Sequence, residues 1–504
     1  MKKVLLTLSI FVSLTMMALA QLRTGVVQSS DSNHPNDDPF DRVRVFIQKQ
    51  MVERQVPSIA VAVARDGKII WEEAFGWADR ENRIQATPHT IYSLASISKP
   101  ITATGLMILK ERGQIDLDRP INEYLGEAKI KVRVGNAADL TVRRVANHTS
   151  GLPLHYQFFY EDEPFRAPSR DETIQRYGNA VTAPGEKYQY SNLGYGILDY
   201  VIARTSGKSY ADFMRTEVFL PLGLTHMSVD VGPGLEKQQA VRYGPDGLPI
   251  PFYGFDHSGG SAIYASAHDL VRFGMFHLKA HLPDQKAILT DQSIDEMQKP
   301  TAESGNNNGY GIGWITGEYS GKRRSVAHSG GMGGVSTLLR LFPEEKISIV
   351  VLSNSNSSLP GMVTEEIISV VVPAAARKPT QPVQPFAEPV FKPTDQLIGN
   401  WKGNVHTYKG EIPFTLEIKA DGDIHTRLGT QLRTLLNRVD FRDGYLTGSM
   451  LSDIGTEDAN RTRYLLTLSL KLRGNGLNGA MTAQSQPGKR AGNALTHWVE
   501  LKKQ

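Results

Sequence analysis

The sequence predicts an α+β domain followed by a small all-β domain. Three observations support this prediction: strand-like apolar runs stand at both ends of residues 39–372, helical patterns lie between them, and residues 395–504 alternate like β-strands. When the first and last strands of a domain enclose its helices, those strands have to pair in one antiparallel sheet. The 504 residues also provide enough chain for about two or three domains.

The composition suits a globular protein and excludes several classes. Hydrophobic residues make up 40% of the chain, and 56 Lys+Arg nearly balance 52 Asp+Glu, for a formal net charge of +4. Because no long basic run is present, nucleic acid is not an expected partner. The lack of cysteine excludes disulfides, thiol catalysis and Cys-ligated zinc. A small-molecule or peptide substrate is the expected partner, and the sequence does not indicate an oligomeric state.

Residues 1–20 predict a secretory signal peptide. Two lysines precede the apolar run Val4–Leu14, and Ala18-Leu19-Ala20 is a small-x-small cleavage site. The run is shorter than the roughly 20 residues of a membrane span. We therefore expect export, no membrane span after signal cleavage, and a periplasmic or secreted location. Residues 21–38, rich in Ser, Asn, Asp and Pro, are predicted to be a disordered leader.

The first predicted elements are a helix and a β-hairpin. Apolar residues at helical spacing predict a helix over Phe40–Arg54, which Pro57 ends. The apolar runs Ile59–Val63 and Lys68–Phe75 are joined by Arg65-Asp66-Gly67. An Asp-Gly turn between two such runs favours a hairpin, so this pair is expected to enter the sheet.

The middle of the domain is mostly helical, and its end returns to strands. Val335–Phe342 and Ile347–Ser353 are apolar runs joined by a tight turn, which predicts a second hairpin. Residues Gln157–Arg170 are aromatic and acidic without a clean period, so they form either a loop over a cleft or a surface excursion. Further helices are predicted over Leu140–Ala146, Leu193–Ser206, Tyr210–Val218, Ala265–Leu278 and Met362–Val372.

After residue 372 the composition changes. Prolines spaced through residues 373–394 predict a stiff, extended linker. Residues 395–504 predict about eight short strands and no helix, which is typical of a small barrel or sandwich. Gly399-Asn400-Trp401 resembles the opening of lipocalin-type barrels, and we expect a packing domain without a ligand. The strands are Gly399–Tyr408, Pro413–Ile418, Ile424–Leu428, Leu432–Val439, Tyr445–Met450, Tyr464–Leu472, Leu477–Thr482 and Leu495–Leu501.

Ser96 and Lys99, in the segment Thr90–Gln114, are the first residues that suggest a reaction. A helix that begins at or just before Ser96 places both side chains on one face, one turn apart. An unprotonated lysine can take the proton of a serine hydroxyl and make it a nucleophile. Pro100 fits the first turn of such a helix. Because the pattern is short, a capping serine followed by a solvated lysine is the alternative when the pattern stands alone.

The second motif is Tyr190-Ser191-Asn192. The phenol of Tyr190 can relay a proton if a nearby cation lowers its pKa. Asn192 can offer its amide to a substrate. The same motif also suits the N-cap of the helix that follows, and the two roles are compatible.

The third motif is His328-Ser329-Gly330-Gly331, which precedes the strand predicted at Val335. Its glycines let a substrate approach the strand edge, where a main-chain N–H can donate to an oxyanion. His328 is expected either to contact a substrate carboxylate or to hydrogen-bond into the site. A glycine-rich turn with an incidental histidine is the alternative.

Together the motifs reveal a family resemblance. Ser96-Ile97-Ser98-Lys99, Tyr190-Ser191-Asn192 and His328-Ser329-Gly330 stand in the order of the three motifs of the class C β-lactamase and penicillin-recognising serine hydrolase superfamily. The resemblance covers roughly residues 40–372. Further segments that match this superfamily are Asp66-Gly67-Lys68, Gly113–Asp118, Asn147–Pro153, Pro184-Gly185-Glu186, Pro221–Leu224 and Gly309–Trp314.

The resemblance implies a fold and a role for each motif. The family has a five-stranded antiparallel sheet flanked by helices, with the site between that sheet and an all-helical half. By position, Ser96 is the acylated nucleophile and Lys99 helps to deprotonate it. Tyr190 passes the proton to the leaving group and then activates the deacylating water. The resemblance assigns substrate binding to Asn192, His328, Ser329 and Gly331, with the N–H groups of Ser96 and Gly331 as the oxyanion hole.

One position departs from class C β-lactamases, which carry lysine where this chain has His328. Lysine gives a β-lactam carboxylate a fixed positive charge, whereas histidine is charged only below about pH 6.5. We therefore predict an exported carboxylesterase or D-aminopeptidase/carboxypeptidase that acts on ester, amide or peptide bonds of small or D-configured substrates. A β-lactamase and a penicillin-binding sensor without turnover are the alternatives.

Two other enzyme classes, the α/β-hydrolases and the metalloenzymes, fit less well. Residues 327–331 approximate a nucleophile elbow, but a predicted strand follows them where that elbow requires a helix. No His-Glu-x-x-His is present and the 13 histidines show no ligand spacing, so no metal and no other cofactor is expected. We also expect that cleavage in the linker releases a folded, active fragment 21–372.

Overall fold

The computed structural model describes residues 38–232, 234–280, 282–305, 307–320, 323–372 and 391–504. The predicted signal peptide, the leader up to residue 37 and the linker up to residue 390 lie outside these residues. Residues from Arg42 to Gln504 form one compact unit, and the description below concerns this unit.

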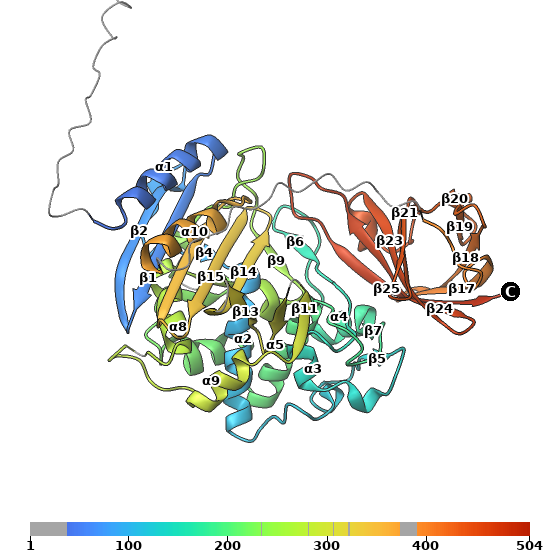
Figure 1. The fold of residues 1–504 in the computed structure, drawn as a ribbon, viewed down its shortest axis with the longest axis horizontal. Helices are drawn as coiled ribbons and strands as arrows, with labels where there is room; N and C mark the ends of the chain where they lie inside the picture. The colour runs from blue at the N-terminus through green and yellow to red at the C-terminus, as the bar shows by residue number, and fades with distance from the viewer. Residues whose placement is uncertain (1–37, 233, 281, 306, 321–322, 373–390) are drawn as a thin grey trace, which may run out of the picture. The chain divides into compact units, whose positions relative to one another are not determined.

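The central feature is an antiparallel sheet with strand order β11-β12-β13-β14-β15-β16-β1-β2-β3 (Figure 1). It confirms the predicted α+β class. The resemblance implied five strands, and the sheet has five long adjacent strands that short strands extend on both sides. The long strands are β14 (Arg323–Met332), β15 (Val335–Phe342), β16 (Ile347–Ser353), β1 (Ser58–Arg65) and β2 (Lys68–Asp79). The short strands are β3 (Ile84–Gln85), β11 (Ala302–Gly305), β12 (Asn308–Tyr310) and β13 (Ile315–Tyr319).

The two ends of this domain meet in the middle of the sheet. Strand β1 pairs with β16 in an antiparallel register that places Val61 opposite Val351. All residues of β16 are buried, so both faces of the sheet are covered and consecutive positions carry apolar side chains. Helix α8 (Ala267–His277) packs against β1 and β16, and α10 (Leu359–Val371) packs against β15 and β16.

The helical half is built around α2 (Ser98–Glu111), whose residues from Ser98 to Leu109 are all buried. A 3₁₀ turn, Ala95–Ile97, precedes this helix, so the predicted helix at Ser96 begins as a 3₁₀ turn and becomes α-helical two residues later. Helices α5 (Asn192–Ser206) and α7 (Ser258–Ser261) pack against α2. The other helices are α1 (Asp41–Arg54), α3 (Val142–Ala146), α4 (Arg170–Tyr177), α6 (Tyr210–Phe213) and α9 (Asp291–Gln298).

Most predicted helices are confirmed within a few residues, with two differences. The segment predicted as Tyr210–Val218 is α6 followed by a π-helical turn, Met214–Phe219. Helices α4 and α9 and the short helix α7 were not predicted. Three small sheets complete this part of the chain: β4 (Tyr92–Ser93), β10 (Ile263–Ala265) and β8 (Met227–Val229); β5 (Lys131–Val132) and β7 (Asn179–Ala180); β6 (Phe158–Tyr160) and β9 (Tyr253–Phe255).

The third motif lies inside a strand, which corrects the prediction of a glycine-rich segment leading to Val335. Strand β14 runs from Arg323 to Met332, and Gly333 and Gly334 form the turn to β15. The sequence hides this strand because residues 329–331 carry no apolar or β-branched side chain. Close packing of Gly330 against the nucleophile segment explains why such side chains are absent there, as described below.

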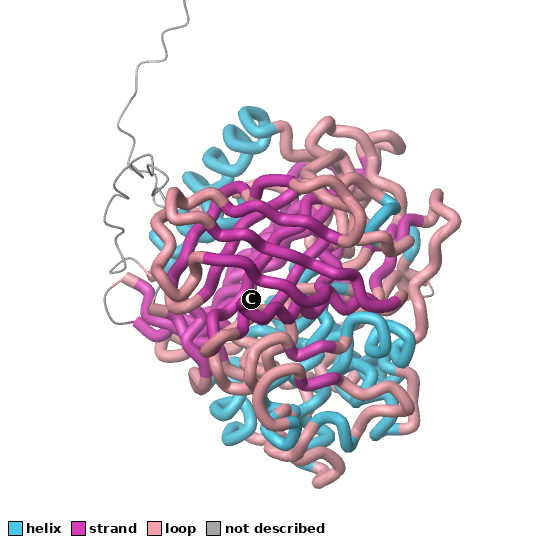
Figure 2. Tube along the Cα trace, turned by 90° about the vertical axis from the view of Figure 1, so that its right-hand side faces the viewer, coloured by secondary structure: helices cyan, strands magenta, loops and turns pink. Residues whose placement is uncertain are grey.

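The C-terminal part is a nearly closed, barrel-like sheet of nine strands in the order β20-β19-β18-β17-β25-β24-β23-β22-β21 (Figure 2). The all-β prediction is confirmed, except that the predicted strand Leu432–Val439 is split into the two edge strands β20 and β21 and a 3₁₀ turn, Ala459–Arg461, is added. Trp401 is buried in the core and its Nε1–H donates to the Leu397 carbonyl at 2.8 Å. The strands are β17 (Gly399–Thr407), β18 (Gly410–Ile418), β19 (Ile424–Leu428), β20 (Thr434–Leu435), β21 (Asn437–Arg442), β22 (Tyr445–Met450), β23 (Tyr464–Arg473), β24 (Gly476–Ser485) and β25 (Ala494–Lys503).

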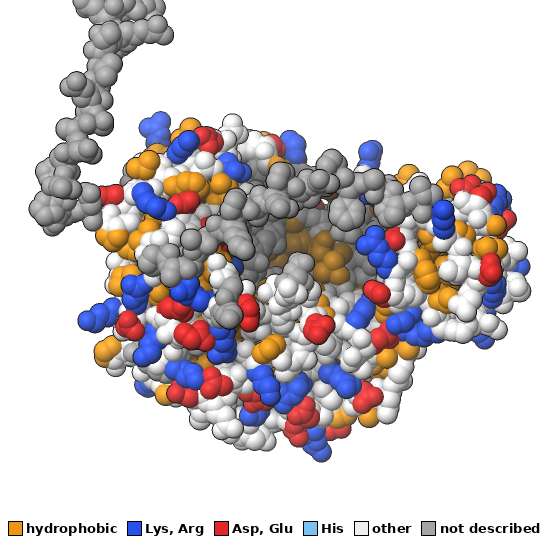
Figure 3. Space-filling view, viewed as in Figure 1, with side chains coloured by type: hydrophobic (Ala, Val, Ile, Leu, Met, Phe, Trp, Pro, Cys, Tyr) orange, Lys and Arg blue, Asp and Glu red, His pale blue; other side chains and the backbone are white. Residues whose placement is uncertain are grey.

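Specific contacts join the C-terminal sheet to the rest of the unit. The carboxylate of Glu186 accepts from Lys471 Nζ at 2.8 Å and from Arg473 at 2.6 Å. Thr496 donates its hydroxyl to the Leu154 carbonyl at 2.8 Å. On the face drawn in Figure 3, lysine and arginine side chains are interspersed with aspartate and glutamate. Among the described residues, no helix has the length and hydropathy that crossing a bilayer requires.

Candidate active site

Ser96 and Lys99 lie one turn apart, as the spacing predicted. Ser96 is in the 3₁₀ turn Ala95–Ile97 and borders a pocket, whereas Lys99 is in the first turn of α2. Lys99 Nζ lies 3.1 Å from Ser96 Oγ, a hydrogen-bond distance. This contact excludes the alternative in which the lysine is solvated, because the side chain of Lys99 is fully buried.

The surroundings of Lys99 favour an uncharged amine. Its Nζ lies 2.8 Å from Asn192 Oδ1 and 2.9 Å from the Gly260 carbonyl, and both groups are acceptors. Burial, which removes the hydration of the ammonium form, holds the pKa of Lys99 well below its usual range. A neutral amine has two N–H donors and one lone pair. With both donors used by Asn192 and Gly260, the lone pair faces the Ser96 hydroxyl, which is the arrangement of a general base.

Tyr190 lies beside this pair, with its ring centre 4.7 Å from Lys99 Nζ. Burial raises the pKa of Tyr190 above its usual value, and a hydrogen bond to Ser96 lowers this pKa by a smaller amount. The sequence-based hypothesis required a nearby cation to lower the pKa of the phenol. The condition is not met here, because burial raises the pKa of Tyr190 and Lys99 is not among the groups that lower it. Tyr190 is therefore a neutral phenol, suited to donate a proton rather than to act as the first base.

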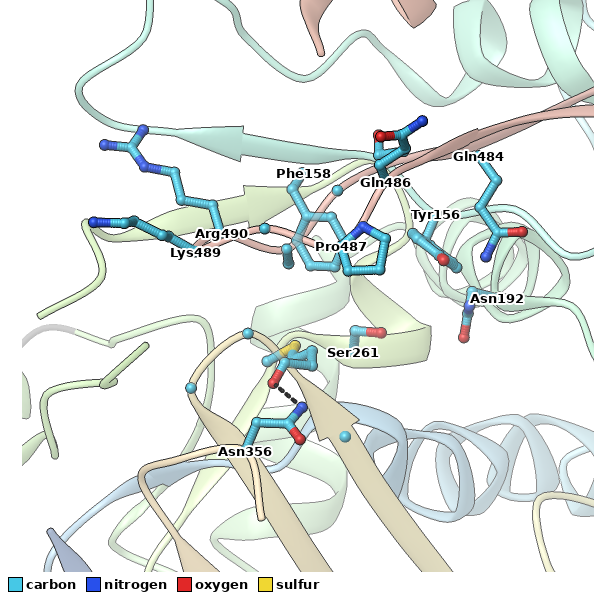
Figure 4. Close-up of a pocket in the computed structure, with 18 of the residues that line it drawn as sticks. Tyr156, Phe158, Asn192, Ser261, Asn356, Gln484, Gln486, Pro487, Lys489 and Arg490 are labelled. Carbon is cyan, nitrogen blue, oxygen red and sulfur yellow. Dashed lines mark hydrogen bonds between the residues drawn. The ribbon is translucent and has the colours of Figure 1, made fainter. Parts of the chain in front are cut away.

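Residues 191 and 192 have separate roles at the start of α5. Ser191 is the N-cap, and its hydroxyl accepts from the Gly194 N–H at 3.1 Å. Asn192 borders the pocket (Figure 4). Because its Oδ1 is bonded to Lys99, its Nδ2–H₂ group is left to donate to a substrate carbonyl.

Strand β14 approaches the nucleophile turn so closely that only glycine fits. A Cβ on Gly330 would lie 2.1 Å from the Leu94 carbonyl oxygen, a distance that van der Waals contact forbids. Thr337, opposite Gly330 in β15, donates its hydroxyl to the same carbonyl at 3.0 Å. Gly331 has open space beside it and borders the pocket together with Ser96. The backbones of Ser96 and Gly331 thus border the same pocket, as two donors of an oxyanion hole would have to.

His328 and Ser329 are placed differently from Gly331. His328 is 2% exposed, and burial lowers its pKa to about 3. Its Nδ1–H donates to the Ser329 carbonyl at 2.8 Å, so its Nε2 accepts from the Tyr310 hydroxyl at 3.1 Å. His328 therefore contacts Tyr310 rather than the pocket, and it offers no positive charge to a substrate carboxylate. The side chain of Ser329 is exposed and borders a different hollow together with Ser325. Neither His328 nor Ser329 lines the pocket of Ser96.

The pocket has a volume of about 560 Å³, and part of its wall comes from the C-terminal domain. The segment Gln484–Gly492, which comprises the end of β24 and most of its connection to β25 and is here called the roof, lines it opposite Asn192 and Ser261 (Figure 4). Tyr156 and Phe158 also line the pocket. Through Phe158, the segment Gln157–Arg170 reaches the cleft, as the first of the two alternatives for this segment required.

Ion pairs attach the roof to the first domain. Arg490 lies 2.9 Å from Asp162 Oδ1, and Lys489 Nζ lies 3.0 Å from Asp246. The pocket thus includes residues from beyond the linker, while the activity of fragment 21–372 stays a prediction.

The family comparison can now be added to this geometry. The model of the Beta-lactamase family matches residues 43–368, which is more than half of the chain. This chain belongs to the β-lactamase family. The match includes Ser96, Lys99, Tyr190 and the third motif, and it identifies the protein as a hydrolytic enzyme of the serine hydrolase superfamily.

Individual relatives agree with this assignment. Penicillin-binding protein 4* of Bacillus subtilis is 29% identical over 323 residues, which cover 58% of this chain and 67% of the relative. A solved class C β-lactamase is 21% identical, with a TM-score of 0.59, and covers 69% of this chain and 100% of that one. The solved SurE, also 21% identical, has a TM-score of 0.61 and covers 92% of this chain and 99% of its own. The likeness to SurE thus extends over the C-terminal sheet as well as the β-lactamase fold.

Within the β-lactamase fold, His148 is a site residue that the sequence did not reveal. It is fully buried, and its Nδ1 accepts from the Ser191 N–H at 3.2 Å. Its ring centre lies 4.4 Å from that of Tyr190 and 4.7 Å from that of Tyr310. His148 therefore holds the backbone and ring of the second motif. In the sequence it is one residue of the loop Asn147–Pro153, and its left-handed φ of 63° is known only from the structure.

His257 is a second residue that the sequence did not reveal, and it lines the pocket directly. Its Nδ1 lies 2.6 Å from Asp256 Oδ1, and His155 Nε2 lies 2.6 Å from the other oxygen of the same carboxylate. Burial lowers the pKa of His257, so this ring adds no positive charge to the pocket at neutral pH.

Proposed function

We propose that this enzyme is an exported carboxylesterase that cleaves small, uncharged acyl esters through an acyl-enzyme on Ser96. The observation that supports this most directly is the geometry of the buried Lys99, whose Nζ lies within hydrogen-bond distance of Ser96 Oγ, Asn192 Oδ1 and the Gly260 carbonyl. An amine in this state removes the proton of the hydroxyl without any further activation.

The proposed reaction consists of an acylation step and a deacylation step, and the proton transfers of the second step reverse those of the first. Ser96 Oγ attacks the carbonyl carbon while Lys99 Nζ takes the hydroxyl proton. The N–H groups of Ser96 and Gly331 donate to the oxyanion, a term worth about 3–4 kcal/mol per donor. Tyr190 gives a proton to the departing alcohol and is reprotonated from Lys99, so the amine is neutral again. Water then attacks the acyl-enzyme by the reverse transfers, and Ser96 regains its proton.

The pocket lining favours an uncharged substrate. No aspartate or glutamate is among the described residues that line it, so a substrate ammonium group finds no carboxylate there. Its two cationic residues, Lys489 and Arg490, are paired with Asp246 and Asp162. The position that is lysine in class C β-lactamases is the buried, uncharged His328. These features support an ester over a β-lactam or an aminopeptidase substrate.

Penicillin acylation is the second candidate, because a relative that is 29% identical is named a penicillin-binding protein. One panel separates the two: nitrophenyl acetate and butyrate, D-alanyl peptides and a chromogenic cephalosporin. We expect the esters to be turned over fastest. Faster turnover of the cephalosporin or the peptides would replace the esterase proposal.

The nucleophile is tested with a fluorophosphonate label. Ser96→Ala is expected to abolish labelling and ester turnover, whereas Ser261→Ala, which removes another serine that lines the same pocket, is expected to leave labelling intact. Retained labelling of Ser96→Ala would assign the nucleophile to another residue. Export is tested separately by sequencing the N-terminus of the protein from the cell exterior, where Gln21 is the expected first residue.

A further inference from the structure

A group of metal-ligating side chains lies outside the Ser96 pocket. One ligand atom each from Glu72, His89 and His268 lie within 4.8 Å of one another. Glu72 is in β2, His89 is in the connection between β3 and β4, and His268 is in the first turn of α8. None of the three lines the pocket of Ser96. The sequence shows no ligand spacing here because the fold brings together residues that are separated along the chain.

The backbone holds these segments in place. The His268 N–H donates to the Pro88 carbonyl at 3.2 Å, which fixes the residue before His89 against the start of α8. The Ser266 N–H donates to the His226 carbonyl at 3.1 Å, and the buried carboxylate of Asp269 accepts from the His226 N–H at 2.5 Å. The donor set is therefore mounted on a bonded framework rather than on independent loops.

The side chains of this group have the donor atoms and the carboxylate charge that a cation requires. His268 Nδ1 lies 2.8 Å from Glu72 Oε2, so a cation that replaces the shared proton meets an imidazole nitrogen and a carboxylate oxygen together. The ring of His89 lies 4.7 Å from that of His268 and 5.2 Å from that of His226. The nearest cationic side chain, Arg272, is bonded to Asp284 at 2.7 Å.

We propose that Glu72, His89 and His268 bind a Zn²⁺ ion, with His226 or a water molecule as the fourth ligand. Two or three imidazole nitrogens and one carboxylate oxygen form the donor set that Zn²⁺ takes in tetrahedral geometry. Mg²⁺ and Ca²⁺ are excluded as occupants because they take oxygen ligands. Bound to three segments that are far apart in the sequence, the ion stabilises the folded chain and takes no part in acyl transfer at Ser96.

The test uses the full-length protein without a histidine tag, after treatment with a chelator. Titration calorimetry with ZnCl₂ is expected to show one site. His89→Ala changes an exposed side chain and leaves the core intact. It is expected to weaken Zn²⁺ binding by ~10–100-fold or more, because the loss of a residue that only supports a metal ligand already has an effect of that size. His406→Ala is the matched control, since His406 is a histidine beside Glu411 and Glu500 in the C-terminal sheet, outside the group.

A second measurement locates the ion without relying on affinity. Zn²⁺ is expected to raise the melting temperature of the wild type and of His406→Ala, and to leave that of a His89→Ala/His268→Ala variant unchanged. Ester turnover is expected to be the same with and without Zn²⁺. The proposal is overturned if the wild type binds no Zn²⁺ at micromolar concentration, or if His89→Ala binds it as tightly as His406→Ala does.

Discussion

The floor and the roof of the pocket differ in charge and in how they are held. The floor consists of Ser96, Lys99, Tyr190 and Asn192, and its hydrogen bonds are made by an uncharged amine that is closed off from water. The roof, Gln484–Gly492, is attached by ion pairs between partly exposed side chains. An exposed ion pair contributes only about 0–1 kcal/mol to stability. Removing one partner of a buried polar group costs more free energy, because the other partner is left buried and unpaired.

This difference separates chemistry from selectivity. Substitutions in the floor change groups that exchange a proton with the substrate, so they are expected to act on kcat. Substitutions in the roof change how much space the acyl group has, so they are expected to act on KM and on the order of preferred substrates. The predictions below test whether the two regions are in fact independent.

The largest effect is expected for Lys99→Met. This change removes the base and leaves an apolar side chain of similar length, so kcat on a nitrophenyl ester is expected to fall about 10⁴-fold. In the wild type the rate is expected to rise with pH as Lys99 loses its proton, with a midpoint below 10.5 because burial lowers the pKa of this amine. A variant that retains a tenth of the wild-type rate would show that another group is the base.

The next largest effect is expected for Tyr190→Phe. The ring still packs against His148, but the hydroxyl that donates to the leaving group is gone, so kcat is expected to fall about 10²-fold. The melting temperature is expected to change little. Esters with better leaving groups need less protonation, and the loss should therefore shrink from an ethyl to a nitrophenyl ester. Equal losses on both esters would remove the proton-donor role.

A smaller effect is expected on stability, again for Lys99→Met. Since the pKa of Lys99 is lower in the folded state, the unfolded chain binds the additional proton below the usual lysine pKa. Folding of the wild type is therefore penalised at low pH, and this penalty fades as the pH rises. The free energy of unfolding is measured with urea at pH 6 and at pH 9. From pH 6 to pH 9 it is expected to increase more for the wild type than for Lys99→Met. A difference that is the same at both values contradicts the uncharged amine.

The smallest effect is expected for Arg490→Gln in the roof. Loss of its bonds to Asp162 should cost about 0.2–1 kcal/mol, which corresponds to a change of about fivefold or less in KM. Bulky acyl esters are expected to gain relative to acetyl esters, with kcat unchanged. Arg442→Gln, which removes an exposed pair with Asp440 in the same sheet, is the control. If kcat falls with Arg490→Gln, the two regions are not independent.

Local patterns were sufficient to predict much of the fold. Strands β15, β16, β19 and β22 have the bounds that alternation and turn residues indicated. The pairing of Ser96 with Lys99 followed from helical spacing alone. The class of enzyme followed from three motifs in a fixed order, which the family match confirms.

The remaining features depend on contacts that no local pattern records. The acceptor that fixes the Lys99 amine is the backbone carbonyl of Gly260, and a carbonyl has no sequence signature. For His328 the sequence left open a substrate contact or a hydrogen bond into the site, and its buried position in β14 gives it the hydrogen bond to Tyr310. The pocket of Ser96 and the group around His268 each combine segments that only the tertiary fold brings together.

The position of the roof along the chain has a consequence for biosynthesis. Residues 484–492 are synthesised long after Ser96, Lys99 and Tyr190, so the wall that they form is the last part of the pocket to be made. That wall is held where β25 pairs with β24 and β17. A chain that ends before residue 484 would therefore have the Ser96 group without this wall of the pocket.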